Sequence, residues 1–134
     1  MLAVALPAVT VHAPRADLSL EVARTEAQRE HGLMDRKSMQ PHTGMIFVFA
    51  DDEPVAFWMK DTLVPLDMIF IAADGTVRKV FANVPVVAPS LPDDQIPREA
   101  ANAKYVIELH AGEAVRDGIA QGVKLDLHGV PNAQ

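Results

Sequence analysis

The chain has 134 residues, 49% of them hydrophobic, and a formal net charge of −6 at pH 7. This is the size of one domain with its own core. It contains no cysteine, which excludes thiol nucleophiles, thiolate metal sites and disulfides. The acidic balance argues against a nucleic-acid partner, because such proteins cluster Lys and Arg to neutralise phosphates. No segment has the roughly 18 to 20 apolar residues that cross a bilayer, so we expect no integral membrane segment.

The N-terminal part predicts two strands and one helix. Residues 1–13 are apolar and end in small residues, as the tail of a secretory signal does. We therefore expect an exported, periplasmic domain whose signal peptide precedes Met1, with a cytoplasmic location left open. Residues 8–12 and 18–23 have strand patterns. Thr25 and Gln28 then fit a capping box, which predicts a short helix that ends at Gly32.

The remaining chain predicts a series of short strands joined by turns. Asp74 and Gly75 form a strong hairpin signal. Residues 85–103 hold four of the ten prolines and predict a long ordered loop. Residues 112–118 predict a second short helix, bounded by glycines. Further strands are predicted at 44–50, 55–60, 66–72, 76–84, 105–111 and 122–128.

About eight short strands and two short helices, linked mostly by short turns, favour a mainly β (α+β) fold. We expect a single compact antiparallel β-barrel or sandwich. The whole chain, 1–134, is predicted as one domain with a core at about 18–127, and 1–17 forms an N-terminal strand segment.

The most informative segment is the predicted hairpin of strands 55–60 and 66–72. Pairing Lys60 with Asp67 places directly opposed residues on shared faces. One face is then a plain core face, with Phe57, Met59, Met68 and Phe70. The other face carries Trp58, Lys60, Asp67 and Ile69.

This second face predicts a polar cleft. Lys60 offers a cation for a carboxylate, and the Trp58 indole offers a surface for a planar or sugar group. Thr62 lies in the turn, and Arg36 and the 85–103 loop are expected to border the cleft. The alternative interpretation is a structural Lys60–Asp67 ion pair with Trp58 in the core.

Ordered sequence pieces give the chain a family resemblance. They are Gly32-Leu33-Met34 with Arg36, Gly44-Met45 with Phe47, Trp58-Met59-Lys60 with Thr62, Pro65-Leu66-Asp67 with Phe70, Asp74-Gly75, and Glu108-Leu109 with Gly112. From Leu18 to about Leu127 the chain resembles DUF192, an uncharacterised bacterial and archaeal domain. The resemblance implies a compact β-rich domain that is often exported, and no established reaction.

We therefore predict a non-enzymatic envelope module that binds a small ligand or an extended peptide, with enzyme activity left open. No catalytic residue, metal ligand or cofactor is predicted, and neither the ligand nor the oligomeric state is specified. The candidate ligand-binding residues are Arg36, Trp58, Lys60, Thr62, Asp67 and Glu108.

Two other functions remain as alternatives. A hydrolase would use Asp67 and Glu108 as paired carboxylates, which requires both to face one cleft. A copper protein would use thioether and imidazole ligands, which suit Cu(I), although methionines also fill cores. Its candidate ligands are Met34, Met39, Met45, Met59, Met68, His31 and His42.

Overall fold

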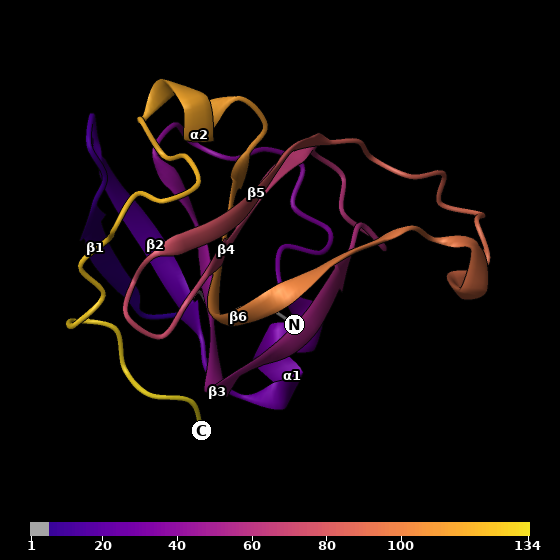
Figure 1. Cartoon of the computed structure of the whole chain (residues 1–134). Coiled ribbons are helices and arrows are strands. Elements are labelled where there is room, and N and C mark those ends of the chain that lie inside the picture. Colours follow the sequence, from indigo (N-terminus) through magenta and orange to yellow (C-terminus); the bar gives the residue numbers. More distant parts are fainter. Residues whose placement is uncertain (1–5) are drawn as a thin grey trace.

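The computed structural model describes residues 6–134. They form one mixed β-sheet with short helices around it (Figure 1). Its order is β1-β2-β3-β6-β4-β5, in which β2 and β3 are parallel and every other pair is antiparallel. The strands are β1 (Ala8–His12), β2 (Asp17–Ala23), β3 (Thr43–Trp58), β4 (Leu66–Ile71), β5 (Val77–Val84) and β6 (Arg98–His110). The helices are α1 (Glu26–His31), the 3-10 helix η1 (Asp93–Gln95) and α2 (Glu113–Arg116).

The mainly β class and the two short α-helices are confirmed, whereas eight strands, a wholly antiparallel arrangement and a closed barrel are not. Within residues 6–134 the sheet has six strands, and β1 and β5 are its two edge strands. The predicted strands 44–50 and 55–60 are halves of β3, because residues 51–54 continue the strand through a bulge. The predicted strand 122–128 makes only an isolated bridge, from Lys124 to Thr76.

The capping box of α1 is confirmed. The Gln28 N–H donates to the Thr25 hydroxyl oxygen at 3.1 Å, and the Gln28 side-chain oxygen accepts from the Thr25 N–H at 3.1 Å. Gly32 ends the helix with a φ of 49°, a region that favours glycine. A helix of six residues is too short to be stable alone, and none of its residues is buried, so these terminal bonds help to hold it.

The predicted hairpin between 55–60 and 66–72 is wrong. The second half of β3 pairs with β6, with Trp58 opposite Arg98, and β4 lies between β6 and β5. Residues 60–65 therefore form a crossing connection over β6, a less local pairing than the sequence pattern favours.

The predicted core face is confirmed, but the predicted second face is not. Trp58 and Lys60 line a cavity together with Phe57 and are therefore separated from Asp67 and Ile69. Met59, Met68 and Phe70 share one buried cluster, against which Phe57 packs. Ile69 belongs to the cluster on the other face of the sheet. The sheet thus has a core on each face, and the candidate site lies beside the cluster that contains Met68.

A sharp bend in β3 shapes that site. A straight strand would hold Phe47 and Phe57 about 33 Å apart, yet their ring centroids are 4.8 Å apart. The pairing with β6 shifts register between Val48 and Glu53, as a bulge does. Arg29 and Lys104 donate to backbone carbonyls at this bend, and a bidentate Asp52–Arg78 pair ties it to β5.

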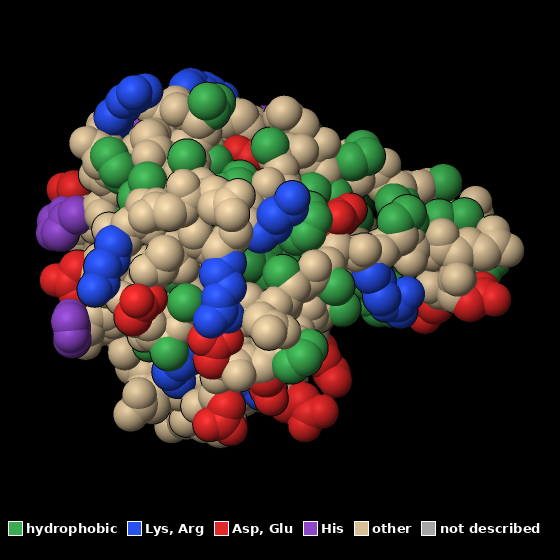
Figure 2. Space-filling view, viewed as in Figure 1, with side chains coloured by type: hydrophobic (Ala, Val, Ile, Leu, Met, Phe, Trp, Pro, Cys, Tyr) green, Lys and Arg blue, Asp and Glu red, His purple; other side chains and the backbone are tan. Residues whose placement is uncertain are grey.

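The predicted 85–103 loop is shorter than expected, because β6 begins at Arg98. The segment that joins β5 to β6 projects from the body as an arm (Figures 1 and 2). It contains η1, and the Asp93 carboxylate accepts from Lys60 Nζ at 2.9 Å. Among the helices of residues 6–134, none has the length and apolar character needed to cross a membrane.

Candidate functional site

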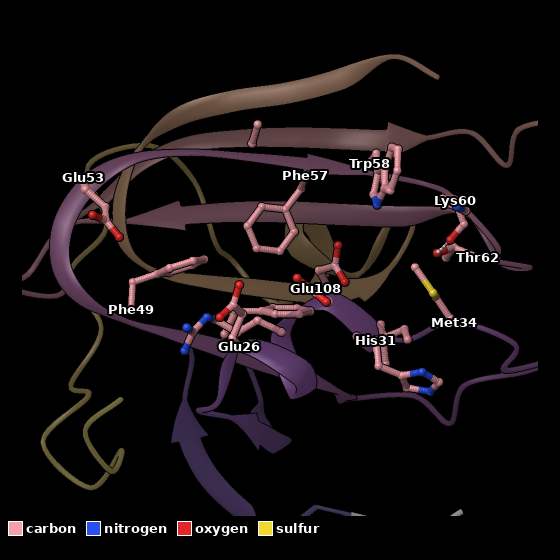
Figure 3. A pocket seen from close by; sticks show the side chains of 16 residues that line it. Glu26, His31, Met34, Phe49, Glu53, Phe57, Trp58, Lys60, Thr62 and Glu108 are labelled. Atoms are coloured by element: carbon pink, nitrogen blue, oxygen red, sulfur yellow. Dashed lines mark hydrogen bonds between the residues drawn. The ribbon is translucent and has the colours of Figure 1, made fainter. Parts of the chain in front are cut away.

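A cavity of about 410 Å³ opens between α1 and the bent strand β3. The first half of β3 contributes Phe47 and Phe49, and its second half contributes Glu53, Phe57 and Trp58. Figure 3 shows the two halves curving around this space, with His31 and Met34 at one side and Glu108 at its centre. The cavity exists because β3 bends over its own beginning and α1 covers the gap.

Glu108 of β6 lies at the inner end of the cavity and is only 4% exposed. It is opposite Met45 of β3 and Met68 of β4, so apolar strands flank it on both sides. Burial raises the pKa of its carboxyl group to about 8, because a low-dielectric surrounding disfavours the charged form. Glu108 is therefore a largely neutral acid at pH 7.

Aromatic side chains line the walls around Glu108. Phe57 makes edge-to-face contacts with Phe47, Phe49 and Phe70, at centroid distances of 4.8, 6.2 and 5.6 Å. Such pairs add stability beyond the apolar area that they bury. The network holds the wall in one arrangement, which favours binding because little order must be imposed on the protein.

The basic groups of the lining already have partners. The Arg29 guanidinium donates to the carbonyl oxygens of Arg24 and Val48 and lies 5.2 Å from the Phe49 ring centroid. Lys60 donates to Asp93, and its Nζ lies 5.3 Å from the Trp58 ring. Both cations are thus held in place by the protein itself.

Four of the six predicted site residues line this cavity: Trp58, Lys60, Thr62 and Glu108. The buried Thr62 hydroxyl donates to the Lys60 carbonyl oxygen at 3.1 Å and fixes the turn after β3. Arg36 and Asp67 lie elsewhere. Arg36 forms a bidentate pair with Glu21 of β2, and its hydrogen bond lowers the pKa of the Glu21 carboxyl.

Asp67 is a structural residue, and its predicted pairing with Lys60 is wrong. Its carboxylate accepts three backbone N–H groups, from Asn83 at 2.9 Å, Gly112 at 3.0 Å and Ala114 at 2.9 Å. These bonds join β4 to the end of β5 and to the start of α2. Asn83 and Gly112 have φ values of 55° and 92°, so Asp67 also holds two residues whose backbone is in the left-handed region.

The predicted Asp67–Glu108 pair of a hydrolase does not form. Glu108 is opposite Met68, whereas Asp67 is opposite Leu109. Because opposed residues share a face and successive residues alternate, the two carboxyl groups point to opposite faces of the sheet. They cannot act on one substrate.

Most of the candidate copper ligands that are methionines are part of an apolar core, and Met39 packs against that core. Met45, Met59 and Met68 belong to the buried apolar cluster. Among the residues that line the cavity, only His31 and Met34 offer an imidazole or a thioether. A copper site would require three or more such ligands to converge.

A different cluster has metal-ligand chemistry: possible ligand atoms of His42, Glu113 and Asp117 all lie within 4.8 Å of one another. The Glu113 carboxylate accepts the His42 N–H, and Asp117 lies 3.2 Å from the His42 ring nitrogen. These contacts join the start of β3 to α2, so a structural role accounts for them.

Sequence reasoning missed the α1 side of the cavity and the aromatic wall. The missed lining residues include Glu26, Arg29, Glu30, Phe47, Phe49 and Glu53. They come from segments distant along the chain, and only the bend in β3 brings them together. One signal was present: Glu108 interrupts an otherwise apolar run from Val106 to Leu109, and a charged residue in a buried strand needs a reason.

Known proteins support this architecture. The family profile described as "Uncharacterized ACR" matches residues 8–127. The chain belongs to the DUF192 family. No curated protein matches it.

Two crystal structures resemble this DUF192 protein. One is a proposed transcription regulator from Sinorhizobium meliloti 1021, with 37% identity and a TM-score of 0.82, covering 92% of this chain and 96% of that one. The other is a protein of unknown function from Novosphingobium aromaticivorans DSM 12444, with 32% identity and a TM-score of 0.75, covering 89% and 83%. Both likenesses extend over most of each chain.

Proposed function

We propose that this DUF192 domain is a non-enzymatic binding module that holds a small molecule in the Glu108 cavity. The observation that carries the proposal is a nearly buried acid at the inner end of an aromatic cavity. Ligand sites are typically concave and mostly apolar, with a few polar groups that fix orientation. A carboxyl group with a strongly raised pKa in such a place marks a candidate functional site.

Binding rather than catalysis fits the chemistry of the cavity. Catalysis by paired carboxylates needs a second acid near the first, and Asp67 faces away. The volume of the cavity and its rigid aromatic wall suit a ligand of one or two rings rather than a long chain. An extended peptide would have to lie across the mouth, where Glu53, Trp58 and His31 form the rim.

The test uses Trp58, the only tryptophan, as a reporter inside the lining. Its emission is followed while a panel of small aromatic, sugar, amine and carboxylate compounds is added. We expect at least one class to give a saturable change. Replacement of Phe57 by Ala removes a wall and should weaken that response about tenfold or more.

Phe81→Ala is the matched control. Phe57 and Phe81 are both half-buried and both pack edge-to-face on Phe70, but only Phe57 lines the cavity. The two variants should lose similar stability, and only Phe57→Ala should lose the fluorescence response. Equal responses in both variants, or no saturable response in the natural protein, would reject the cavity as the binding site.

We also propose that the domain works in the cell envelope, as family members often do. Fractionation of cells that express the complete gene product tests this, and a purely cytoplasmic protein would contradict it. One structural neighbour is described as a proposed transcription regulator. The net charge of −6 does not favour DNA binding, and we expect no salt-sensitive retention of DNA.

A further inference from the structure

The charged groups of the Glu108 cavity that lack an ion-pair partner are mainly acidic. Glu26, Glu30 and Glu53 lie on its exposed rim, and Glu108 lies at its inner end. None of these four carboxyl groups takes part in an ion pair among residues 6–134. The lining cations, in contrast, are engaged by backbone carbonyls or by Asp93. A ligand that enters would therefore meet carboxyl groups that still lack a cationic partner.

The aromatic wall also suits a positive charge. The negative faces of aromatic rings attract cations, most strongly when water is excluded. The Arg98 guanidinium lies 4.5 Å from the Trp58 centroid, and Lys60 Nζ lies 5.3 Å from it. Rings of this cavity thus already hold cations from the protein itself.

A carboxylate ligand fits less well. Near the inner end it would face Glu108, and two carboxyl groups in contact must share a proton. It would also need a free cation, and both Arg29 and Lys60 would have to leave existing partners.

We propose that the Glu108 cavity binds an organic ammonium ion, with the Glu108 carboxylate as its counter-ion and the phenylalanine wall against its apolar body. This inference rests on the proposed binding function and specifies the class of ligand. It predicts that binding is linked to a proton. Free Glu108 holds its proton at pH 7, because burial raises its pKa to about 8. The ammonium ion pairs with the carboxylate, so this proton passes to solvent as the ligand binds.

The experiment compares three ligands of one shape by titration calorimetry: benzylammonium, benzyl alcohol and benzoate. We expect benzylammonium to bind at least about tenfold more tightly than the other two. Repeating the titration in buffers of different ionisation enthalpy counts protons, and close to one should be released per ligand at pH 7.

Glu108→Gln keeps the shape of the side chain and removes its charge. It should weaken benzylammonium binding about thirtyfold or more and abolish proton release, while leaving benzyl alcohol binding within about threefold. Glu99→Gln removes one negative charge from the same strand outside the lining and should change neither quantity.

The pH dependence gives an independent readout. Benzylammonium affinity should rise about tenfold per pH unit between pH 6 and pH 7, since Glu108 must lose its proton. Other charged groups face the cavity from two sides: Glu26, Arg29, Glu30 and His31 from α1, and Glu53 and Lys60 from β3 and the turn after it. His31→Gln should keep the slope, because the proposal assigns the slope to Glu108 alone.

The outcomes separate the two proposals. Tight benzylammonium binding that depends on Glu108 and releases a proton supports the inference. Tighter binding of benzyl alcohol or benzoate, or ammonium binding that Glu108→Gln leaves unchanged, overturns the ammonium assignment while the binding function stands. If none of the three ligands binds, and the wider panel gives no response either, both proposals fail.

Discussion

Two carboxyl groups on the central strands are buried to a similar degree, with Asp67 1% and Glu108 4% exposed. Their surroundings give them different roles. Asp67 accepts three backbone N–H groups, which compensate the charged form for lost water. The Glu108 carboxyl group forms no ion pair among residues 6–134 and is flanked by methionines. It is stable mainly in its neutral form, so Asp67 holds the fold and Glu108 remains free to meet a ligand.

Asp67→Asn tests the structural role. An amide has one accepting oxygen, so at least one of the three N–H groups at Asn83, Gly112 and Ala114 would lose its bond or face an NH₂ group. We expect unfolding to become easier by about 2–3 kcal/mol, measured by urea denaturation. Ligand responses at the cavity should persist in the folded fraction, because Asp67 points to the opposite face.

The exposed Asp51 provides a matched control, since Asp51→Asn should change stability by less than about 0.5 kcal/mol. If Asp67→Asn were equally mild, the three backbone hydrogen bonds would not be important for stability. If it abolished ligand binding without loss of stability, the original prediction of Asp67 as a site residue would be restored.

At the scale of elements, local patterns predicted more than pairing. The capping box of Thr25 and Gln28, the stop at Gly32 and the core face formed by Phe57, Met59, Met68 and Phe70 were predicted correctly. Each depends on neighbours only a few residues away. The Lys60–Asp67 hairpin failed because the sequence does not reveal that β6, nearly forty residues later, inserts between these strands.

The sequence predicted only part of the candidate site, because it reveals local neighbours better than distant ones. Trp58, Lys60 and Thr62 lie together in sequence and remained together in the structure. The aromatic wall needed the bend in β3, and the bend needs a bulge beside four polar or proline residues, 51–54, that read as a turn. The sequence pattern of such a segment does not distinguish a bulged strand from a turn until its partner strand is known.

The contact between β3 and β6 is close enough to test with one methyl group. A Cβ on Gly44 would lie 2.0 Å from the Glu108 carbonyl oxygen and 3.0 Å from Leu109 Cδ2. Backbone atoms cannot move aside at low cost, so Gly44→Ala should separate the two strands locally. We expect a loss of at least about 3 kcal/mol, or failure to fold.

Gly129→Ala serves as the comparison, because nothing lies within 4 Å of the Cβ it would add. Its denaturation midpoint should match that of the natural protein. A tolerated Gly44→Ala would mean that β3 and β6 can separate locally without loss of the fold, and the position of Glu108 would then be less fixed than proposed.

At the scale of the whole molecule, the cavity makes stability depend on pH. The ion pairs at the surface shift carboxyl pKa values in the usual direction, which is downward. Arg78 hydrogen bonds lower the pKa of Asp52, and Arg36 does the same for Glu21. Those two groups favour folding once pH exceeds their unfolded pKa values, and their stabilisation is lost as pH falls through their lowered folded values. Glu108 acts in the opposite direction.

The Glu108 pKa is about 8 in the folded protein and 4.5 in an unfolded chain, so the folded state binds more protons between these values. Its stabilisation is complete below pH 4.5 and is lost as pH rises through 8. Urea denaturation of the natural protein and Glu108→Gln should therefore diverge with pH. Between pH 5 and pH 7.5 the free energy of unfolding of the variant should rise by about 3 kcal/mol relative to that of the natural protein. Groups such as Glu21 and Asp52 are common to both proteins and cancel in this comparison. A difference that does not change with pH would show that Glu108 is solvated in the folded state, and the cavity would then lack the neutral acid on which its binding chemistry depends.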